Sequence, residues 1–218
     1  MSNNDSFIDE VTDEVRRDRL FALLKRWGWV GIVGVVLIVG GAAFWEWRRS
    51  AAEAEARAFG DAVMAAMQAE SLAARTEALA GLPEGSPERL ALKRLLEAAS
   101  AADAGDTAKA LADYDAVASD GTLPETLGHL ALLKRVLLAG PEMSAADRGA
   151  ALERLTRPGA PYRLLAQEQQ ALDLAAAGDT DGAVAALRAV LAEDGVTPGL
   201  RRRATQLMVA LGADPAAS

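Results

Sequence analysis

An uncharged run of nineteen residues, 27–45, most constrains what this chain can fold into. At about 1.5 Å of rise per residue, such a helix spans roughly 28 Å, the thickness of a bilayer core. All four tryptophans stand at the ends of the run, where amphipathic rings favour lipid headgroups: Trp27, Trp29, Trp45 and Trp47. We therefore predict a transmembrane helix over residues 27–47. A cleaved signal peptide is the alternative, but its apolar core is usually about 7 to 15 residues, and its charged leader is shorter than the twenty-six residues here.

Residues 1–26 form a mixed-charge leader in which apolar side chains recur at helical spacing. We expect an amphipathic, cytoplasmic helix that either docks on a partner or lies on the lipid surface. Five basic residues precede the apolar run and three follow it, and basic residues mark the cytoplasmic side of a membrane helix. The predicted topology is single-pass, with the N-terminus in the cytoplasm and the C-terminal domain in the periplasm.

Glycines recur along one side of the predicted membrane helix. Gly28, Gly31 and Gly34 are three residues apart, and Gly41 follows Gly34 by seven. A stripe without side chains lets a second helix approach closely in lipid. We therefore predict that Gly31, Gly34 and Gly41 contact a helix of a partner. The alternative is that these glycines only reflect the high glycine content of membrane helices.

The composition of the larger, C-terminal part excludes several classes of protein. Residues 51–218 carry sixteen Lys/Arg against twenty-four Asp/Glu, and this acidic surface argues against a nucleic-acid partner. A chain with 51% hydrophobic residues and no cysteine is neither disordered nor a disulfide scaffold. Only four of the 23 basic residues are lysines, and this bias, together with the alanine richness, hints at a GC-rich bacterial genome. In a bacterium, the predicted topology corresponds to an anchor in the inner membrane.

Beyond Pro83 the sequence is a succession of helical patterns with no alternating strand pattern. Similar breaks occur at Gly105, Gly140 and Gly178, with spacings of 35 and 38 residues. Tetratricopeptide repeats, which are helix–turn–helix units, have a period of about 34 residues. We predict an all-α fold with a tetratricopeptide-like helical array over residues 83–218.

Equivalent positions around the three breaks carry residues suited to packing two helices together. Leucines stand thirteen residues before each glycine, and small residues stand five after it. We expect the following residues at the helix crossings: Leu92, Leu127, Leu165, Ala110 and Ala183. Ten residues before each glycine the chain has Leu95, Leu130 and then Glu168, which departs from the pattern.

Two helical segments flank the array. Residues 48–82 are rich in Ala, Glu and Arg, and we predict a helical stalk that becomes the first helix of the domain. The closing helix, residues 198–211, begins after a capping Thr197 and has one apolar face. Its other face carries Arg201, Arg202 and Arg203, which we expect to be solvated; an acidic partner or anionic lipid is the alternative.

The chain resembles a known family in its leader and its Gly-Asp breaks. FIDEVTDEVRRDRL at 7–20, LLKRWGWVG at 23–31, GDTAKA at 105–110 and GDTDGA at 178–183 are similar to the YfgM-type ancillary subunits of the bacterial SecYEG translocon. The resemblance implies a membrane protein complex as partner, with a role in passing secreted proteins to periplasmic chaperones or in holding unfolded clients. A scaffold or assembly factor of another inner-membrane complex, respiratory or cell-division, is the alternative.

The sequence offers few groups for catalysis. It has no cysteine and one histidine, His129, with no HExxH, GxSxG or GxxxxGK[ST] pattern. A lone helical histidine is usually structural or solvated. The acid pairs Asp113/Asp115 and Asp179/Asp181 lie in or at the start of predicted helices, where acids face water or complement the helix dipole. We therefore predict an interaction protein with no catalytic residue, cofactor or metal, and not an enzyme such as a peptidase.

Overall fold

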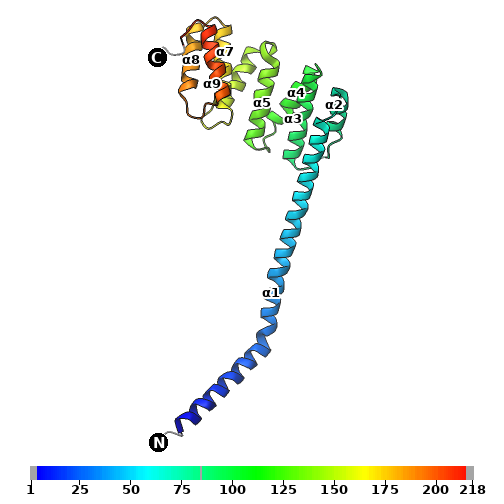
Figure 1. Cartoon of the computed structure of the whole chain (residues 1–218), viewed down its shortest axis with the longest axis vertical. Coiled ribbons are helices and arrows are strands. Elements are labelled where there is room, and N and C mark those ends of the chain that lie inside the picture. The colour runs from blue at the N-terminus through cyan, green and yellow to red at the C-terminus, as the bar shows by residue number, and fades with distance from the viewer. Residues whose placement is uncertain (1–3, 84, 215–218) are drawn as a thin grey trace. The chain divides into compact units, whose positions relative to one another are not determined.

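The computed structural model describes residues 4–83 and 85–214, with side chains from Trp29 onward. Over these residues the chain is helical and has no strand, which confirms the predicted all-α class (Figure 1). The helices are α1 (Asn4–Met67), α2 (Leu72–Ala80), α3 (Pro87–Asp103), α4 (Thr107–Ala118), α5 (Glu125–Ala139), the 3-10 helix η1 (Gly140–Glu142), α6 (Ala145–Leu155), α7 (Arg163–Ala176), α8 (Thr180–Ala192) and α9 (Pro198–Ala210).

The chain divides into an N-terminal unit, Met1–Gly60, and a C-terminal unit, Asp61–Ser218. Helix α1 accounts for the described part of the N-terminal unit. Within the described residues, Trp29–Met67 includes one window that is long and apolar enough to cross a membrane, and none of that window is buried. An apolar helix left uncovered in this way needs lipid or another protein to cover it.

The chain turns between α1 and α2, where the sequence predicts one continuous helical segment over 48–82. Ser71 begins α2, because its hydroxyl accepts a hydrogen bond from the amide of Ala74 at 3.1 Å. Lys93 of α3 donates from Nζ to the carbonyl oxygens of Ala80 at 2.8 Å and Leu82 at 3.1 Å. The stalk and the first short helix are therefore separate elements, and α3 holds the C-terminal end of α2.

Side-chain caps start most helices of the C-terminal unit. Asp106 and Asp179 each accept a hydrogen bond from an amide three residues later, at 3.1 Å and 2.8 Å. Such a cap stabilises a helix by about 1 kcal/mol. The other residues that cap in this way are Ser71, Ser86, Ser144 and Thr197.

Glycine ends α3 and α7 in the same way. Gly105 has φ +82° and Gly178 has φ +86°, a left-handed conformation that glycine adopts without steric cost. In both turns the amide of the next aspartate donates to the carbonyl five residues earlier, at 2.9 Å. The predicted break at Gly140 differs, because Pro141 follows it and has no amide hydrogen to donate. A 3-10 turn over Gly140–Glu142 takes the place of the Gly-Asp turn.

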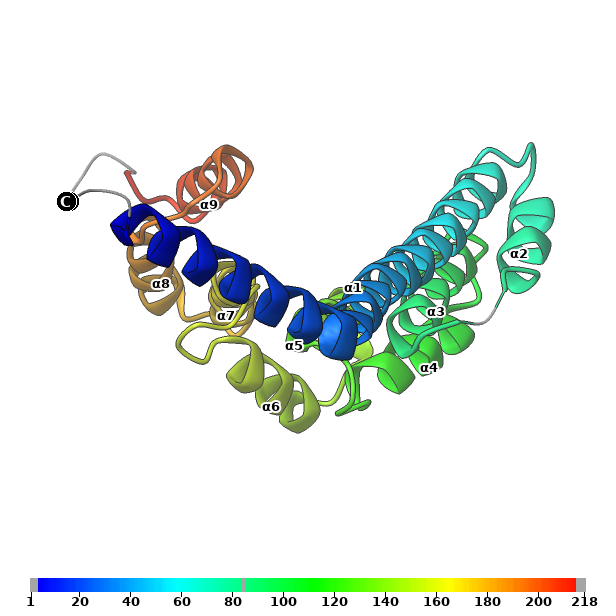
Figure 2. The ribbon, with the colours of Figure 1, turned by 90° about the horizontal axis from the view of Figure 1, so that it is seen from below.

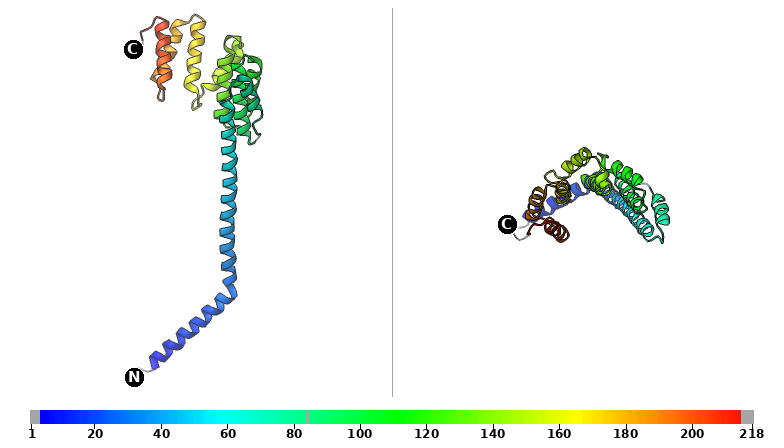
Figure 3. Two further views of the ribbon diagram at one scale, coloured as in Figure 1. Left: turned by 45° about the vertical axis from the view of Figure 1, so that its right-hand side comes forward. Right: turned by 90° about the horizontal axis from the view of Figure 1, so that it is seen from above.

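Consecutive helices of the C-terminal unit pack against one another in chain order. The contacts of α3 with α4, α4 with α5 and α7 with α8 are more extensive than those of α5 with α6, α6 with α7 and α8 with α9. We refer to α3/α4, α5/α6 and α7/α8 as the first, second and third helix pairs. Figures 2 and 3 show this unit as an arc, with α3, α5 and α7 on its inner side and α4, α6 and α8 on its outer side. One buried cluster runs from Ala91 to Ala166, and a second joins Ala171 to α8 and α9. Helix α7 contributes to both.

The expected crossing residues are only partly buried. Ala110 and Ala183 have no exposed surface, and Leu127 and Leu165 are half-buried. Leu92 is 40% exposed, so its predicted burial is wrong. The buried face of α3 includes Ala91, Leu95 and Ala98 instead, which follow the 3.6-residue period and place Leu92 at the edge of that face.

Candidate protein-interaction surface

The acidic pairs of the sequence have structural partners. Asp113 accepts a hydrogen bond from Lys109 at 2.5 Å, and Asp115 lies 3.3 Å from Arg135 of α5. Asp179 caps α8, and Asp181 lies in the first turn of that helix. Within the described residues no group of three His, Asp or Glu side chains is placed to hold a metal ion.

Three leucines on the inner helices α3, α5 and α7 are exposed. Leu92 on α3, Leu137 on α5 and Leu172 on α7 are 40%, 52% and 37% exposed. They stand 13, 3 and 6 residues before the glycine that follows their helix. At about 100° per residue these positions fall on the same third of a helix surface, and at about 1.5 Å per residue their levels along the helix axis differ by up to about 15 Å. Each inner helix packs on the outer helix of its pair, so its exposed surface faces away from that partner. We call these three residues the leucine row.

Other exposed large apolar side chains of the C-terminal unit lie near its ends. They are Met64 and Met67 on α1, Leu72 on α2 and Val209 on α9. The leucine row differs from them because it follows successive helix pairs. Leu92 belonged to the predicted set, whereas Leu137 and Leu172 did not. Each of the three leucines lies just outside the buried face of its helix. That face is defined only once the neighbouring helices are known, so the sequence alone does not identify these residues as exposed.

Two hollows lie at the junctions between helices. One of about 390 Å³ is lined by Leu111 and Asp115 of α4, Arg135 of α5 and Met143. Another of about 420 Å³ lies between the segments that precede α7 and α9, and its lining includes Pro161, Tyr162, Leu165, Thr197 and Leu200. Both volumes lie at the lower end of the range of about 300–1,000 Å³ that is usual for ligand pockets, and each hollow is also large enough for a single side chain of a partner.

All three residues of the arginine run on α9, Arg201, Arg202 and Arg203, are exposed, and the last of them also pairs with a buried acid. Arg203 donates from Nε and Nη2 to the two carboxylate oxygens of Glu168 on α7, at 2.8 Å and 2.5 Å. The side chain of Glu168 is 8% exposed, and these hydrogen bonds raise the pKa of the Arg203 guanidinium further. Glu168 departs from the leucine pattern because α9 supplies its counter-charge.

Two more arginines join successive helices. Arg148 of α6 donates from Nε to both carboxylate oxygens of Asp173 on α7 at 2.8 Å, and from Nη1 to the carbonyl oxygen of Val136 on α5 at 3.1 Å. Arg163, the first residue of α7, donates to both carboxylate oxygens of Glu193 at 2.8 Å and 2.9 Å. These hydrogen bonds hold the pKa of Glu193 below its ordinary value. Sequence reasoning missed both pairs, which fix successive helices in place.

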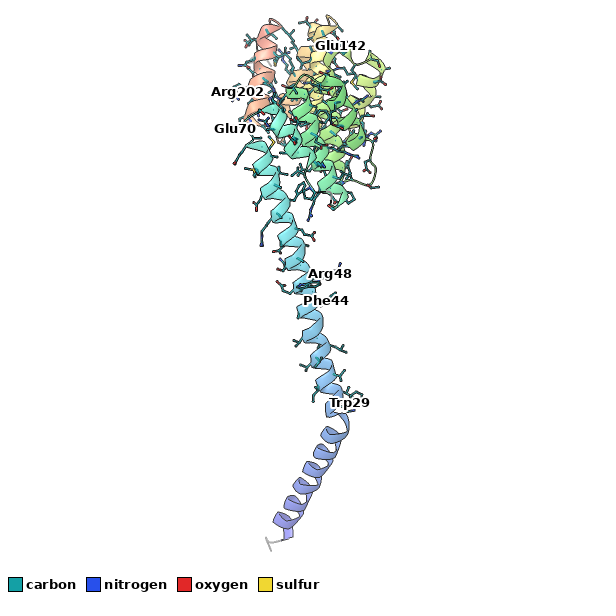
Figure 4. The ribbon with its side chains drawn as sticks, turned by 90° about the vertical axis from the view of Figure 1, so that its right-hand side faces the viewer. Trp29, Phe44, Arg48, Glu70, Glu142 and Arg202 are labelled. Carbon is teal, nitrogen blue, oxygen red and sulfur yellow. The ribbon has the colours of Figure 1, made fainter. Side chains whose placement is uncertain are left out.

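The described residues of the predicted anchor are exposed. Trp29, Trp45 and Trp47 are 64–67% exposed, and Trp29 and Phe44 stand clear of α1 in Figure 4. The side chain of Trp27 lies outside those that the structure describes. Gly31, Gly34 and Gly41 have open space where a Cβ would stand, so these positions are free for contact with lipid or another helix.

The first turns after the apolar run are charged. The guanidinium of Arg49 lies 5.8 Å from the centre of a Trp45 ring, within cation–π range. Arg49 and Arg57 both pair with Glu53, at 3.0 Å and 3.1 Å. Aromatic rings followed by a charged helix are the pattern expected at a membrane surface.

Comparisons of the chain with models of protein families, with curated proteins and with solved structures gave no match.

Proposed function

We propose that the chain is a membrane-anchored protein-interaction module, in which a single-pass helix confines a tetratricopeptide-like array to the surface of a bacterial inner membrane. The unburied apolar window of α1 supports the anchor, and the three helix pairs of the C-terminal unit support the array. The excess of basic residues before the apolar run favours a cytoplasmic N-terminus and a periplasmic helical unit. We propose no catalytic role.

The leucine row carries this proposal. Exposed leucines recur on α3, α5 and α7, and because each is only 37–52% exposed, burying the rest of one is worth about 1 kcal/mol. A row that crosses three helix pairs suits an apolar segment of a partner rather than a small ligand. Because residues 51–218 are acidic, basic residues around that apolar segment would be favoured.

For the partner, we propose a membrane protein complex, with the SecYEG translocon as the first candidate. This choice rests on the resemblance of the leader and the Gly-Asp breaks. The glycine stripe adds a possible contact inside the membrane, worth on the order of 1 kcal/mol for each packed pair. Anchoring raises the effective concentration of the array at such a complex, so a weak contact through the leucine row is sufficient for binding.

The orientation is tested with protease added to spheroplasts. Digestion of residues 48–218 with protection of the leader supports the proposed topology. A fully protected C-terminal unit would refute it.

The partner is tested by purifying the full-length chain in mild detergent and identifying what copurifies by mass spectrometry. A variant in which Leu92, Leu137 and Leu172 are changed to Ser should lose a partner held by the row. Val209→Ser is the matched control, because Val209 is 58% exposed on α9, outside the row. Equal copurification with both variants would show that the row binds nothing. Recovery of a respiratory or cell-division complex would replace the translocon as the partner.

Whether the membrane helix itself recognises the partner is tested separately, by changing Gly31 and Gly34 together to Leu. Leucine preserves the apolar span but closes the space between helices. Copurification of the partner should fall while the amount and orientation of the protein stay constant. If copurification also survives replacement of residues 27–47 by a poly-leucine span, the anchor is only a tether.

A further inference from the structure

His129 is the only histidine of the chain and lies in the second turn of α5. Its side chain is 2% exposed and ranks among the largest fully buried side chains. Helix α5 packs against both α4 and α6, so His129 is buried where the first helix pair meets the second.

The polar surroundings of the imidazole suit its neutral form. Nε2 lies 3.4 Å from a carboxylate oxygen of Glu125, one turn earlier on the same helix. Nδ1 is buried and has no hydrogen-bond partner. A neutral ring with its hydrogen on Nε2 leaves Nδ1 as a bare acceptor, whereas a protonated ring would bury an N–H group without an acceptor, at a substantial energetic cost.

Burial and two nearby arginines also disfavour a proton on His129, whereas Glu125 favours it. Burial is the main cause that lowers its pKa below the ordinary 6.5; Arg154 and Arg157 lower it further, and Glu125 opposes them. Arg154 also donates to the carbonyl oxygen of Ala118 at 3.3 Å, which links α6 to the end of α4. A second cation on His129 would therefore stand beside the arginine that joins these helices.

The backbone next to His129 is close to α4. A Cβ on Gly128 would lie 3.9 Å from the carbonyl oxygens of Val117 and Ala118, at ordinary van der Waals distance. We call the meeting point of the end of α4, the start of α5 and the end of α6 the joint. At the joint, α4 presents the backbone carbonyls of its C-terminal end and α6 presents the side chain of Arg154.

We propose that His129 is a pH-sensitive latch of this joint, closed when the imidazole is neutral and opened when it is protonated. The opened state binds a proton that the closed state excludes, so stability of the joint is complete above about pH 6.5 and is lost as the pH falls from there toward the lower pKa of the closed state. Leu92 and Leu137 lie on helices of the two pairs that the joint connects. The latch itself does not depend on whether the leucine row binds a partner.

A single histidine permits a direct test on the full-length chain in detergent micelles, purified with a tag that lacks histidine. Nuclear magnetic resonance of the ¹³C-labelled imidazole should give a pKa below 6.5. Amide hydrogen exchange is then compared at about pH 7.5 and about pH 5.5, one unit either side of the ordinary pKa, after correction for intrinsic rates. Protection of α5 and α6 should fall at the lower pH by at most about tenfold, while protection of α8 and α9 stays constant. A pKa of 6.5 or above, or an equal loss in all helices, would overturn the proposal.

Variants separate the latch from a general effect of acid. His129→Gln should remove the pH difference in exchange. Glu125→Gln changes a carboxylate that is 71% exposed, so the fold should tolerate it; loss of its charge should lower the imidazole pKa of the closed state, so the loss of protection should begin at the same pH but become larger and continue to lower pH. Glu142→Gln, an exposed residue of η1, is the matched control and should change neither. If Glu125→Gln changes neither the imidazole pKa nor the pH dependence of exchange, as expected for Glu142→Gln, the latch proposal is wrong.

Discussion

Replacing Arg203 by glutamine should destabilise the C-terminal end of the helical unit, because the buried carboxylate of Glu168 on α7 then loses its counter-charge. Arg203 is 53% exposed at its side chain, yet it supplies both hydrogen bonds to the carboxylate of Glu168, which is 8% exposed. Glutamine cannot satisfy both carboxylate oxygens or neutralise their charge. The variant therefore leaves an unpaired, buried anion on α7.

The expected loss of stability follows from the exposed fractions of the Arg203 and Glu168 side chains. Removing one partner of a fully buried ion pair costs about 3–5 kcal/mol. Because half of the Arg203 side chain is in water, solvent reaches the pair and screens it, so we expect a loss of about 2 kcal/mol. In a unit of this size, 1 kcal/mol shifts Tm by about 2–4 °C, so the expected decrease is about 4–8 °C.

The measurement is a thermal melt of the full-length chain in detergent, followed by circular dichroism. Arg202→Gln is the matched control, because Arg202 is the adjacent exposed residue of the same helix (Figure 4) and its replacement should leave Tm unchanged within about 1 °C. Adding Glu168→Gln to the Arg203 variant removes the buried charge and should recover part of the loss. Coincident melts of the Arg203 and Arg202 variants would refute the reasoning.

Three further perturbations follow from burial and backbone geometry. Ala183→Asp places a charge at a fully buried position and should cost about 3 kcal/mol or more in urea unfolding, whereas Ala185→Asp, exposed on the same helix, should cost under about 1 kcal/mol. Gly178 has φ +86°, so Gly178→Ala should lower stability by about 1–2 kcal/mol. Gly149 lies in open space on α6, so Gly149→Ala should raise stability by about 0.5–1 kcal/mol. Equal melting temperatures of the two variants would contradict this. Burial raises the pKa of Tyr114, so its contribution to stability is full below about pH 10 and is lost as the pH rises toward the higher pKa of the folded state. Tyrosinate absorbance of a Tyr114→Phe variant should lack the rise that this residue gives above about pH 10.

Local signals explain how much of the fold is predictable from the sequence. The Gly-Asp turns before α4 and α8 follow from two adjacent residues, because glycine adopts the positive φ and aspartate caps the next helix. The closing helix α9 is equally local, since Thr197 caps it at the predicted place. The turn between α1 and α2 has no Gly or Pro to mark it, so it depends on Ser71 and on packing against α3.

The candidate surface is less predictable, because it depends on which helices become neighbours. The burial of Leu92 is decided by the direction in which α3 meets α4 and α5, and a shift of one residue rotates a side chain by about 100°. The partner of Glu168 lies 35 residues away on α9. Spacing within the sequence indicates that position 168 is unusual, but only the packed helices identify Arg203 as the reason.

Helix α7 is the element through which the two parts of the C-terminal unit act on each other. Its first half, with Ala166, belongs to the cluster formed with α3–α6, and its second half, with Ala171, belongs to the cluster formed with α8 and α9. Ion pairs to Arg148 and Arg203 hold α7 from both sides. Loss of the Arg203 pair should therefore release α9 and α8 first, and hydrogen exchange in α3–α5 should slow or stay unchanged rather than accelerate. Because the apolar cluster around α3–α5 does not include α9, two of the three leucines in the row would keep their positions. A partner bound mainly by Leu92 and Leu137 would then tolerate the Arg203 variant, whereas one that needs Leu172 would not.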